Sequence, residues 1–168
     1  VAPSVREFLL RPDGGDASPY AIGSHINVAV IAGGRPDTRS YSLVGSSRAE
    51  AYRIAVHRAA QSRGGSAYMW SLKPGARPDI SDPASLVELD WSRRHFCLIA
   101  GGIGITPIVA MARALDAAGA GYALHYLAHD RERLVLAEDW QARGEGRVHT
   151  YATGVDGRPD LQGLVGPW

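Results

Sequence analysis

The chain has 168 residues, with 18 Lys and Arg against 17 Asp and Glu and a formal net charge of +1. Because 45% of the residues are hydrophobic and only 21% are charged, the chain can bury a core, and a disordered tail is excluded. The even charge balance argues against nucleic-acid binding, and the single cysteine excludes both an internal disulfide and a four-cysteine iron–sulfur cluster.

Neither a membrane span nor a secretion signal is visible, so we expect a soluble, cytoplasmic protein. No stretch of about 18 apolar residues occurs. The chain begins at Val1 with no apolar signal core and no Met, so we expect a processed chain or a piece of a longer one.

Residues 1–92 contain short β-type runs that turn residues separate. One run covers residues 25–31 and stops at Gly33-Gly34, and another covers residues 41–44. In a further run, Tyr52, Ile54 and Val56 share one face of a strand. Several short strands at such close spacing predict an antiparallel β barrel.

Residues 93–168 show a different period. Residues 95–100 form a nearly continuous apolar run, typical of a strand buried on both faces. A glycine turn follows, and then a helix for which Thr106 is the expected N-cap and Pro107 the expected first residue, with Gly119 at its end.

Two further strands and a helix complete the predicted α/β half. Strands are expected over residues 122–128 and 147–152. Between them, Asp130 is expected to cap a helix that Gly144 closes. Strand, helix, strand, helix, strand predicts a doubly wound parallel sheet, with the boundary to the barrel near residues 90–94.

The glycine turn of the α/β half is a candidate pyrophosphate site. Gly101, Gly102 and Gly104 allow a ligand to approach the backbone, and the following helix points its free N–H groups at the same place. The ordinary dinucleotide fingerprint is not met, because Pro107 stands where its last glycine belongs. A plain tight turn is the alternative, although the Thr-Pro pair favours a ligand.

Two features of the barrel half are candidates for binding a phosphate and a flat ring. Along residues 39–43, an Arg can clamp a phosphate, a Tyr can stack on a heterocycle and a Ser can bond to its edge. About 20 residues later, Arg63 precedes a Gly-Gly-Ser corner that can hold an anion. An ordinary half-buried strand and a flexible turn are the alternatives.

The order of these three motifs resembles the ferredoxin–NADP reductase superfamily, in particular the phthalate dioxygenase reductase and vanillate demethylase reductase group. The resemblance covers nearly the whole chain. It implies a flavin-binding antiparallel barrel over residues 1–92 and an incomplete NAD(P)-binding α/β domain over residues 93–168. In this group the Arg-Gly-Gly-Ser form accompanies FMN, so FMN is favoured over FAD.

The resemblance also implies roles for individual residues. Ser42 and Thr106 are the catalytic positions, which orient the flavin ring and the nicotinamide. The residues implied in cofactor binding are Arg39, Ser40, Tyr41, Ser42, Val56, His57, Gly64, Gly65, Ser66, Gly101, Gly102, Gly104, Ile105, Thr106, His129 and Asp130.

The chain departs from the family pattern in three ways. His129 and Asp130 stand where the family often has Arg and then Ser or Thr near the adenosine ribose. An acidic side chain there repels a 2′-phosphate, so NADH is favoured over NADPH. The nicotinamide-facing Cys-Gly-Pro turn and the four-cysteine ferredoxin domain are missing, and we expect the first barrel strand to lie ahead of Val1.

The resemblance therefore implies a reductase module that passes electrons from NADH through FMN to a 2Fe–2S ferredoxin domain or an oxygenase component. No side chain needs to act as an acid or base, because the flavin carries the redox chemistry. Two alternatives stay open: a flavin-binding module without NADH reductase activity, and a glycine-turn α/β protein that binds no flavin. We expect no metal site, nucleic-acid partner or membrane partner.

Overall fold

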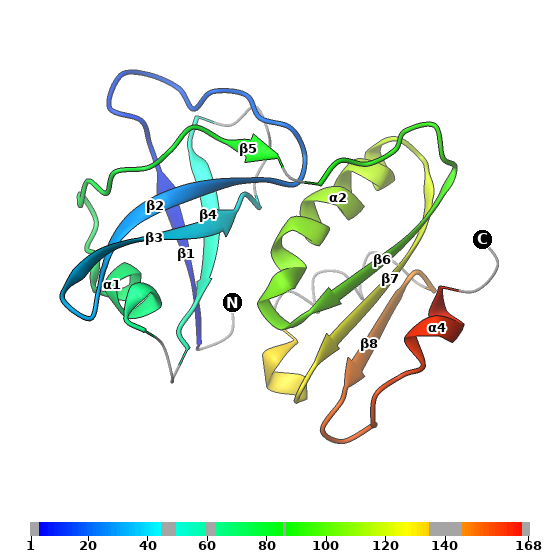
Figure 1. Cartoon of the computed structure of the whole chain (residues 1–168). Helices are drawn as coiled ribbons and strands as arrows, with labels where there is room; N and C mark the ends of the chain where they lie inside the picture. Colours follow the sequence, from blue (N-terminus) through cyan, green and yellow to red (C-terminus); the bar gives the residue numbers. More distant parts are fainter. Residues whose placement is uncertain (1–3, 45–49, 60–62, 86, 135–145, 166–168) are drawn as a thin grey trace. The chain divides into compact units, whose positions relative to one another are not determined.

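A computed structural model describes residues 4–44, 50–59, 63–85, 87–134 and 146–165 (Figure 1). The chain divides into two compact units, with unit 1 extending to Glu88 and unit 2 beginning at Leu89. Each unit has its own sheets and its own helices.

Unit 1 is built from antiparallel strands. The strand β2 (Ser24–Ala32) lies between β3 (Arg35–Ser42) and the short β5 (Ala84–Ser85), while β1 (Val5–Leu10) pairs with β4 (Tyr52–His57). These antiparallel sheets confirm the fold class predicted for the first half.

The hairpin between β2 and β3 turns at the predicted glycine pair. Gly33 and Gly34 have φ of 58° and 77°, and two successive positive φ values match the type I′ turn that suits a twisted hairpin. The turn fixes a register in which Val28 faces Arg39 and Ile26 faces Tyr41. The Arg-x-Tyr-Ser segment therefore lies on a strand, as predicted.

A short helix, α1 (Gly65–Ser71), completes unit 1. Its N-cap and first two residues are the Gly-Gly-Ser corner that the sequence indicated, but the helix itself was not predicted. Met69 on this helix is fully buried in the core with Ile26, Val28 and Ile54. The corner is thus anchored to the barrel core by the helix that it starts.

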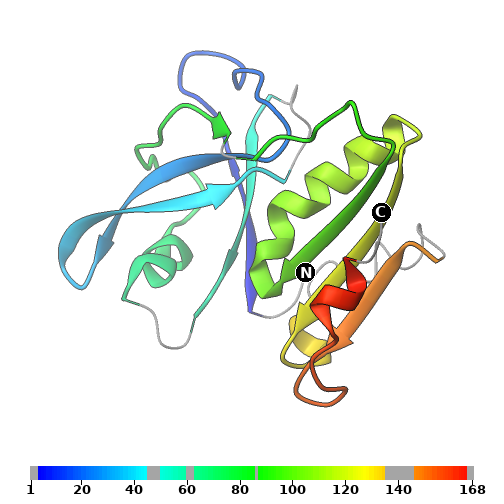
Figure 2. The ribbon, with the colours of Figure 1, turned by 45° about the vertical axis from the view of Figure 1, so that its right-hand side comes forward.

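Unit 2 is a parallel sheet with a helix packed on it (Figures 1 and 2). Its order is β6 (His95–Gly101), β7 (Gly121–Ala128), β8 (Val148–Ala152), which confirms the parallel sheet expected for the second half. The helix α2 (Ile105–Ala117) buries Val109, Ala112 and Leu115, and α4 (Leu161–Leu164) follows the last strand.

Gly119 ends α2 as predicted. Its φ is +66°, its N–H donates to the carbonyl of Asp116 at 3.1 Å, and the N–H of Ala120 donates to Leu115 at 2.9 Å. This pair of bonds is the Schellman motif, which satisfies the last carbonyls of a helix. Gly144, the expected end of the next helix, lies outside the described residues.

No helix in the described ranges is long and apolar enough to cross a membrane.

Candidate functional site

The strand β3 presents the Arg-x-Tyr-Ser side chains of unit 1. Tyr41 is half-buried against the barrel core, and this burial raises the pKa of its hydroxyl. The Ser40 hydroxyl donates to Oδ1 of Asn27 on β2 at 2.6 Å, so it already has a partner. Ser42 is partly buried at the end of the strand.

Arg39 lies directly against the Gly-Gly-Ser corner. A Cβ built on Gly65 would stand 2.6 Å from Nε, 2.9 Å from Cγ and 3.2 Å from Cδ of Arg39. Gly64 (φ +106°) approaches the β2–β3 turn equally closely, with its virtual Cβ 2.9 Å from the Gly33 nitrogen. The structure therefore brings together two predicted features that lie about 25 residues apart in sequence. We call Arg39, Gly64, Gly65 and Ser66 the anion corner.

Some polar groups of the anion corner have no hydrogen-bond partner among the described residues. The Ser66 hydroxyl oxygen is buried from solvent and has no hydrogen-bond partner among the described residues. The described residues likewise offer no partner to Nε or Nη2 of Arg39, since its bonds use Nη1. An unsatisfied buried hydroxyl costs about 1–3 kcal/mol, and an anionic oxygen would remove that cost. The donors present therefore fit a phosphate group.

Val56 and His57 lie at the end of β4. Val56 is 1% exposed, and its carbonyl accepts the indole N–H of Trp70 on α1 at 3.1 Å. His57 is partly buried and is paired in register with Val5 on β1. The Val56 carbonyl is therefore committed to holding α1, which carries the Ser66 hydroxyl.

The glycine turn of unit 2 is open at its surface. Gly102 has a φ of +51° and begins the 3₁₀ turn Gly102–Gly104, which leads directly into α2. A Cβ at Gly101, Gly102 or Gly104 would meet no heavy atom of the described residues within 4 Å. The backbone of this turn is thus accessible to a ligand, as the sequence predicted.

The predicted cap of α2 is wrong by two residues. The N-cap is Gly104, and α2 begins at Ile105, so Thr106 is already helical and Pro107 is the third helical residue rather than the first. The reason is the 3₁₀ turn, which starts the helical conformation early, and a proline in the first turn removes an N–H that has no helical partner. Thr106 is buried (6% exposed), and its hydroxyl donates to the Ile103 carbonyl at 3.1 Å.

Asp130 is an N-cap, as predicted, but the element that it caps is the three-residue 3₁₀ helix Arg131–Arg133, whose C-cap is Leu134; the rest of the expected helix lies outside the described residues. Its Oδ1 accepts the Arg133 N–H at 3.0 Å and its Oδ2 lies 3.0 Å from Arg133 Nε. The imidazole of His129 lies against Gly154 after β8, since a Cβ there would be 2.7 Å from His129 Cε1. The two residues are adjacent to the end of the parallel sheet, and the Asp130 carboxylate is already paired with a cation.

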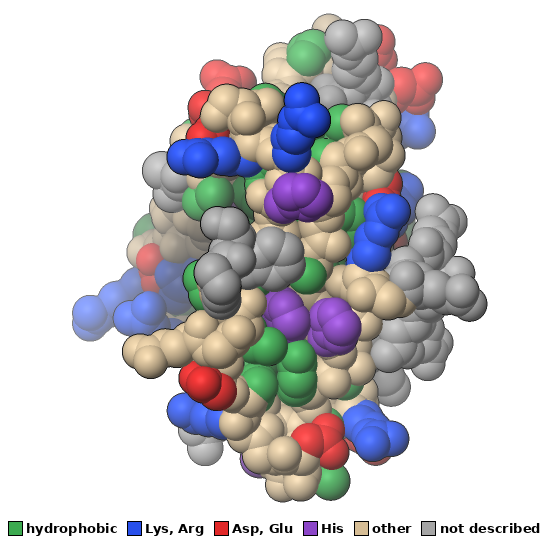
Figure 3. Space-filling view, turned by 90° about the vertical axis from the view of Figure 1, so that its right-hand side faces the viewer, with side chains coloured by type: hydrophobic (Ala, Val, Ile, Leu, Met, Phe, Trp, Pro, Cys, Tyr) green, Lys and Arg blue, Asp and Glu red, His purple; other side chains and the backbone are tan. Residues whose placement is uncertain are grey.

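Sequence reasoning missed a ring stack on the parallel sheet of unit 2. The rings of His125 and His149 stack at 4.9 Å, and the hydroxyl of Tyr151 lies 3.0 Å from His125 Nδ1. Burial, followed by the charge of His149, lowers the pKa of His125. Figure 3 shows histidine side chains beside hydrophobic ones on one face of the molecule. The sequence signal for this stack is that His149 and Tyr151 alternate along the β8 segment while His125 lies on the neighbouring β7 segment.

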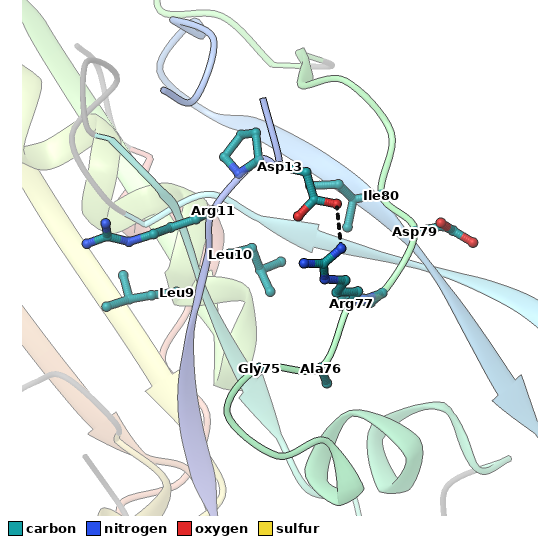
Figure 4. Close-up of a pocket in the computed structure, with 11 residues that line it drawn as sticks. Leu9, Leu10, Arg11, Asp13, Gly75, Ala76, Arg77, Asp79 and Ile80 are labelled. Carbon is teal, nitrogen blue, oxygen red and sulfur yellow. Dashed lines mark ion pairs between the residues drawn. The ribbon is translucent and has the colours of Figure 1, made fainter. Parts of the chain in front are cut away.

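A cavity of about 520 Å³ in unit 1 lies elsewhere in the fold (Figure 4). Its wall includes Leu9 and Leu10 at the end of β1 and Ile80, and Arg77 pairs with Asp13 at 3.8 Å beside it. None of the predicted site residues lines this cavity.

Comparison with known proteins relates the chain to reductases. No family model matches it. It is 36% identical over 158 residues to the phthalate dioxygenase reductase of Burkholderia cepacia, covering 89% of this chain and 48% of that protein. It is 40% identical over 134 residues to the vanillate O-demethylase oxidoreductase of a Pseudomonas strain, covering 79% of this chain and 41% of that protein.

A solved structure gives the same result. Phthalate dioxygenase reductase, described as a modular structure for electron transfer from pyridine nucleotides to a 2Fe–2S centre, matches with a TM-score of 0.86 and 30% identity, over 100% of this chain and 54% of that chain. The chain spans between 24% and 53% of the length of curated relatives that it matches.

Proposed function

Because the chain belongs to the phthalate dioxygenase reductase-like group of the ferredoxin–NADP reductase superfamily, we propose that it is a flavoprotein reductase module that carries electrons from NADH through FMN to an iron–sulfur partner of an oxygenase system. The observation that carries this proposal is the anion corner, where Arg39 lies on Gly65 beside a buried hydroxyl without a partner. We further propose a cytoplasmic location.

FMN suits the anion corner because its single phosphate is a terminal monoester. Such a phosphate offers three oxygens and up to two negative charges, and the corner supplies one guanidinium and one hydroxyl. The guanidinium edge formed by Nε and Nη2 can donate two parallel hydrogen bonds to it. Tyr41 and Ser42, farther along β3, would then lie beside the ring system, and the segment of Val56 and His57 would lie along the flavin.

NADH is proposed to bind at the glycine turn of unit 2. The exposed backbone of Gly101, Gly102 and Gly104 and the N-terminus of α2 form a place for its pyrophosphate. Asp130 would accept a bond from the adenosine ribose, with His129 beside it. Because Arg133 neutralises part of the Asp130 charge, we expect the preference for NADH over NADPH to be modest.

The protein supplies orientation rather than acid–base chemistry. When bound, the flavin supplies hydride acceptance and single-electron release. Arg39 and Ser66 would hold the phosphate, Ser42 would orient the edge of the ring, and Thr106 would position the nicotinamide. The Thr106 hydroxyl is fixed by the Ile103 carbonyl, so its orientation is set before the ligand arrives.

The test is an anaerobic titration of the full chain with FMN, followed by NADH. We expect tight uptake of FMN and then bleaching of the flavin absorbance when NADH is added. Bound FMN that NADH fails to bleach would contradict the reductase proposal. A chain that binds FMN but has no measurable affinity for NADH would be a flavin-binding module without reductase activity. A chain that takes up no FMN would be a glycine-turn protein that binds no flavin.

A further inference from the structure

A carboxylate holds the arginine of the anion corner. Oδ2 of Asp37 lies 2.7 Å from Nη1 of Arg39, and the same Nη1 donates to the Thr38 carbonyl at 2.8 Å. Both charged residues lie on β3, and because side chains alternate along a strand, residues 37 and 39 point to the same side.

The Asp37 carboxylate is itself fixed and ionised. Its Oδ1 accepts the Thr38 backbone N–H at 2.7 Å. This bond, the bond from Arg39 and the charges of Arg39 and Arg63 lower the pKa of Asp37 below its ordinary value. At neutral pH the carboxylate is therefore a permanent negative charge beside the anion corner.

The pairing divides the guanidinium into two sides. Nη1 is committed to Asp37 and Thr38, while the described residues leave Nε and Nη2 without a partner and the stem lies on Gly65. The uncommitted side is the part of the guanidinium that remains to donate hydrogen bonds to a phosphate at the anion corner. Because Nη1 of the same guanidinium lies 2.7 Å from Oδ2 of Asp37, the negative charge of Asp37 would repel a phosphate bound to Arg39.

We propose that Asp37 is a positioning and charge-tuning residue of the flavin-phosphate site: it holds Arg39 on Gly65 through Nη1, and its negative charge lowers the affinity of the site for the FMN phosphate. This inference rests on the proposed function, because it assumes that the anion corner binds FMN. Asp37 lies outside the Arg-x-Tyr-Ser and Gly-Gly-Ser motifs, and its negative charge is expected to weaken FMN binding.

The test compares FMN with riboflavin, the same flavin without a phosphate, on the full-length chain. Asp37→Asn keeps an oxygen that accepts from Nη1 but removes the charge. We expect it to bind FMN about two- to fivefold more tightly than the wild type, since exposed charge interactions of this kind change binding by that factor. Riboflavin affinity should not change, and the FMN gain should shrink as salt is added.

Two further variants separate charge from positioning. Asp37→Ala removes both the charge and the acceptor, so its FMN affinity should fall below that of Asp37→Asn. Glu7→Gln is the matched control, because Glu7 is paired with Arg53 at 3.7 Å on the other sheet of unit 1 and its removal makes the same change in net charge. It should leave both affinities unchanged.

Each outcome decides the proposal. If the wild type prefers FMN to riboflavin but Asp37→Asn binds FMN no more tightly, the charge-tuning role is wrong while the proposed function stands. An equal gain for riboflavin, or for Glu7→Gln, also overturns it. If the wild type binds neither flavin, the proposed function fails and this inference fails with it.

Discussion

The contact between Arg39 and Gly65 gives a prediction that separates binding from folding. In Gly65→Ala, the new methyl group would stand 2.6 Å from Nε and 2.9 Å from Cγ of Arg39, closer than any Cβ tolerates. The neighbour is a side chain, so Arg39 would swing away and the backbone would stay in place. Gly65 has no positive φ and is the first residue of α1, where alanine is favoured over glycine by up to about 1 kcal/mol.

The expected loss is therefore in FMN binding rather than in stability. A displaced Arg39 gives up charge-assisted hydrogen bonds to the phosphate worth about 1.5–3 kcal/mol. This corresponds to a Kd for FMN that is about 10- to 140-fold higher, by the tenfold change per 1.4 kcal/mol. Riboflavin affinity and the free energy of unfolding in urea should stay within about 1 kcal/mol of the wild type.

The assays are titration with FMN and riboflavin, and unfolding in urea, for Gly65→Ala and for a control variant. Gly14→Ala is the matched control, because Gly14 is in unit 1, has no positive φ, and a Cβ there meets nothing within 4 Å. Gly65→Ala that binds FMN as tightly as this control would refute the reasoning, since Arg39 would then not be part of the phosphate site.

Three further predictions follow from the other polar groups. Ser66→Ala should weaken FMN binding, because it removes a donor to the phosphate. It should also raise the free energy of unfolding of the flavin-free protein by about 1 kcal/mol, because it removes an unsatisfied buried hydroxyl. An FMN affinity equal to that of the wild type would count against the site. The lowered pKa of His125 means that the unfolded chain takes up the proton more readily than the folded one, so stability should be full above about pH 6.5 and fall as the pH drops below it. Urea unfolding across this range checks this, and His125→Phe should lose that part of the pH dependence. Asp130→Asn should narrow the ratio of NADH to NADPH affinity by about two- to fivefold, and an unchanged ratio would place the adenosine ribose elsewhere.

Local sequence rules predicted the elements whose ends are marked by glycine. The Gly33-Gly34 pair marked the hairpin between β2 and β3, and Gly119 marked the end of α2, because both positions need a positive φ that other residues rarely adopt. The apolar run of β6 correctly indicated a parallel strand. Its expected burial on both faces was wrong, because Leu98 and Ala100 are buried whereas Ile99 between them is exposed.

The other errors concern the positions where helices begin. Thr106 is a good N-cap residue in general, yet the 3₁₀ turn before it starts the helix at Ile105. The helix α1 has only seven residues, no acidic residue in its first turn and glycine as its N-cap, so its sequence lacks the usual signals of a helix start. Packing of Met69 into the core stabilises it, and tertiary packing is not visible in a local pattern.

The candidate site was predictable in its parts but not in its assembly. Arg39 and Gly65 are both part of recognisable motifs, but their contact depends on how β3 and α1 pack, which a single sequence does not encode locally. The ion pair of Asp37 with Arg39 was equally invisible, because an Asp two residues before an Arg on a strand has no fixed meaning until the backbone register is known.

The most direct test of the central claim is the affinity of the full chain for FMN beside its affinity for riboflavin under identical conditions. The account predicts that FMN binds at least tenfold more tightly, because Arg39 and Ser66 bind the phosphate and a charge-assisted hydrogen bond alone is worth about that factor. Equal affinities for the two flavins would contradict it.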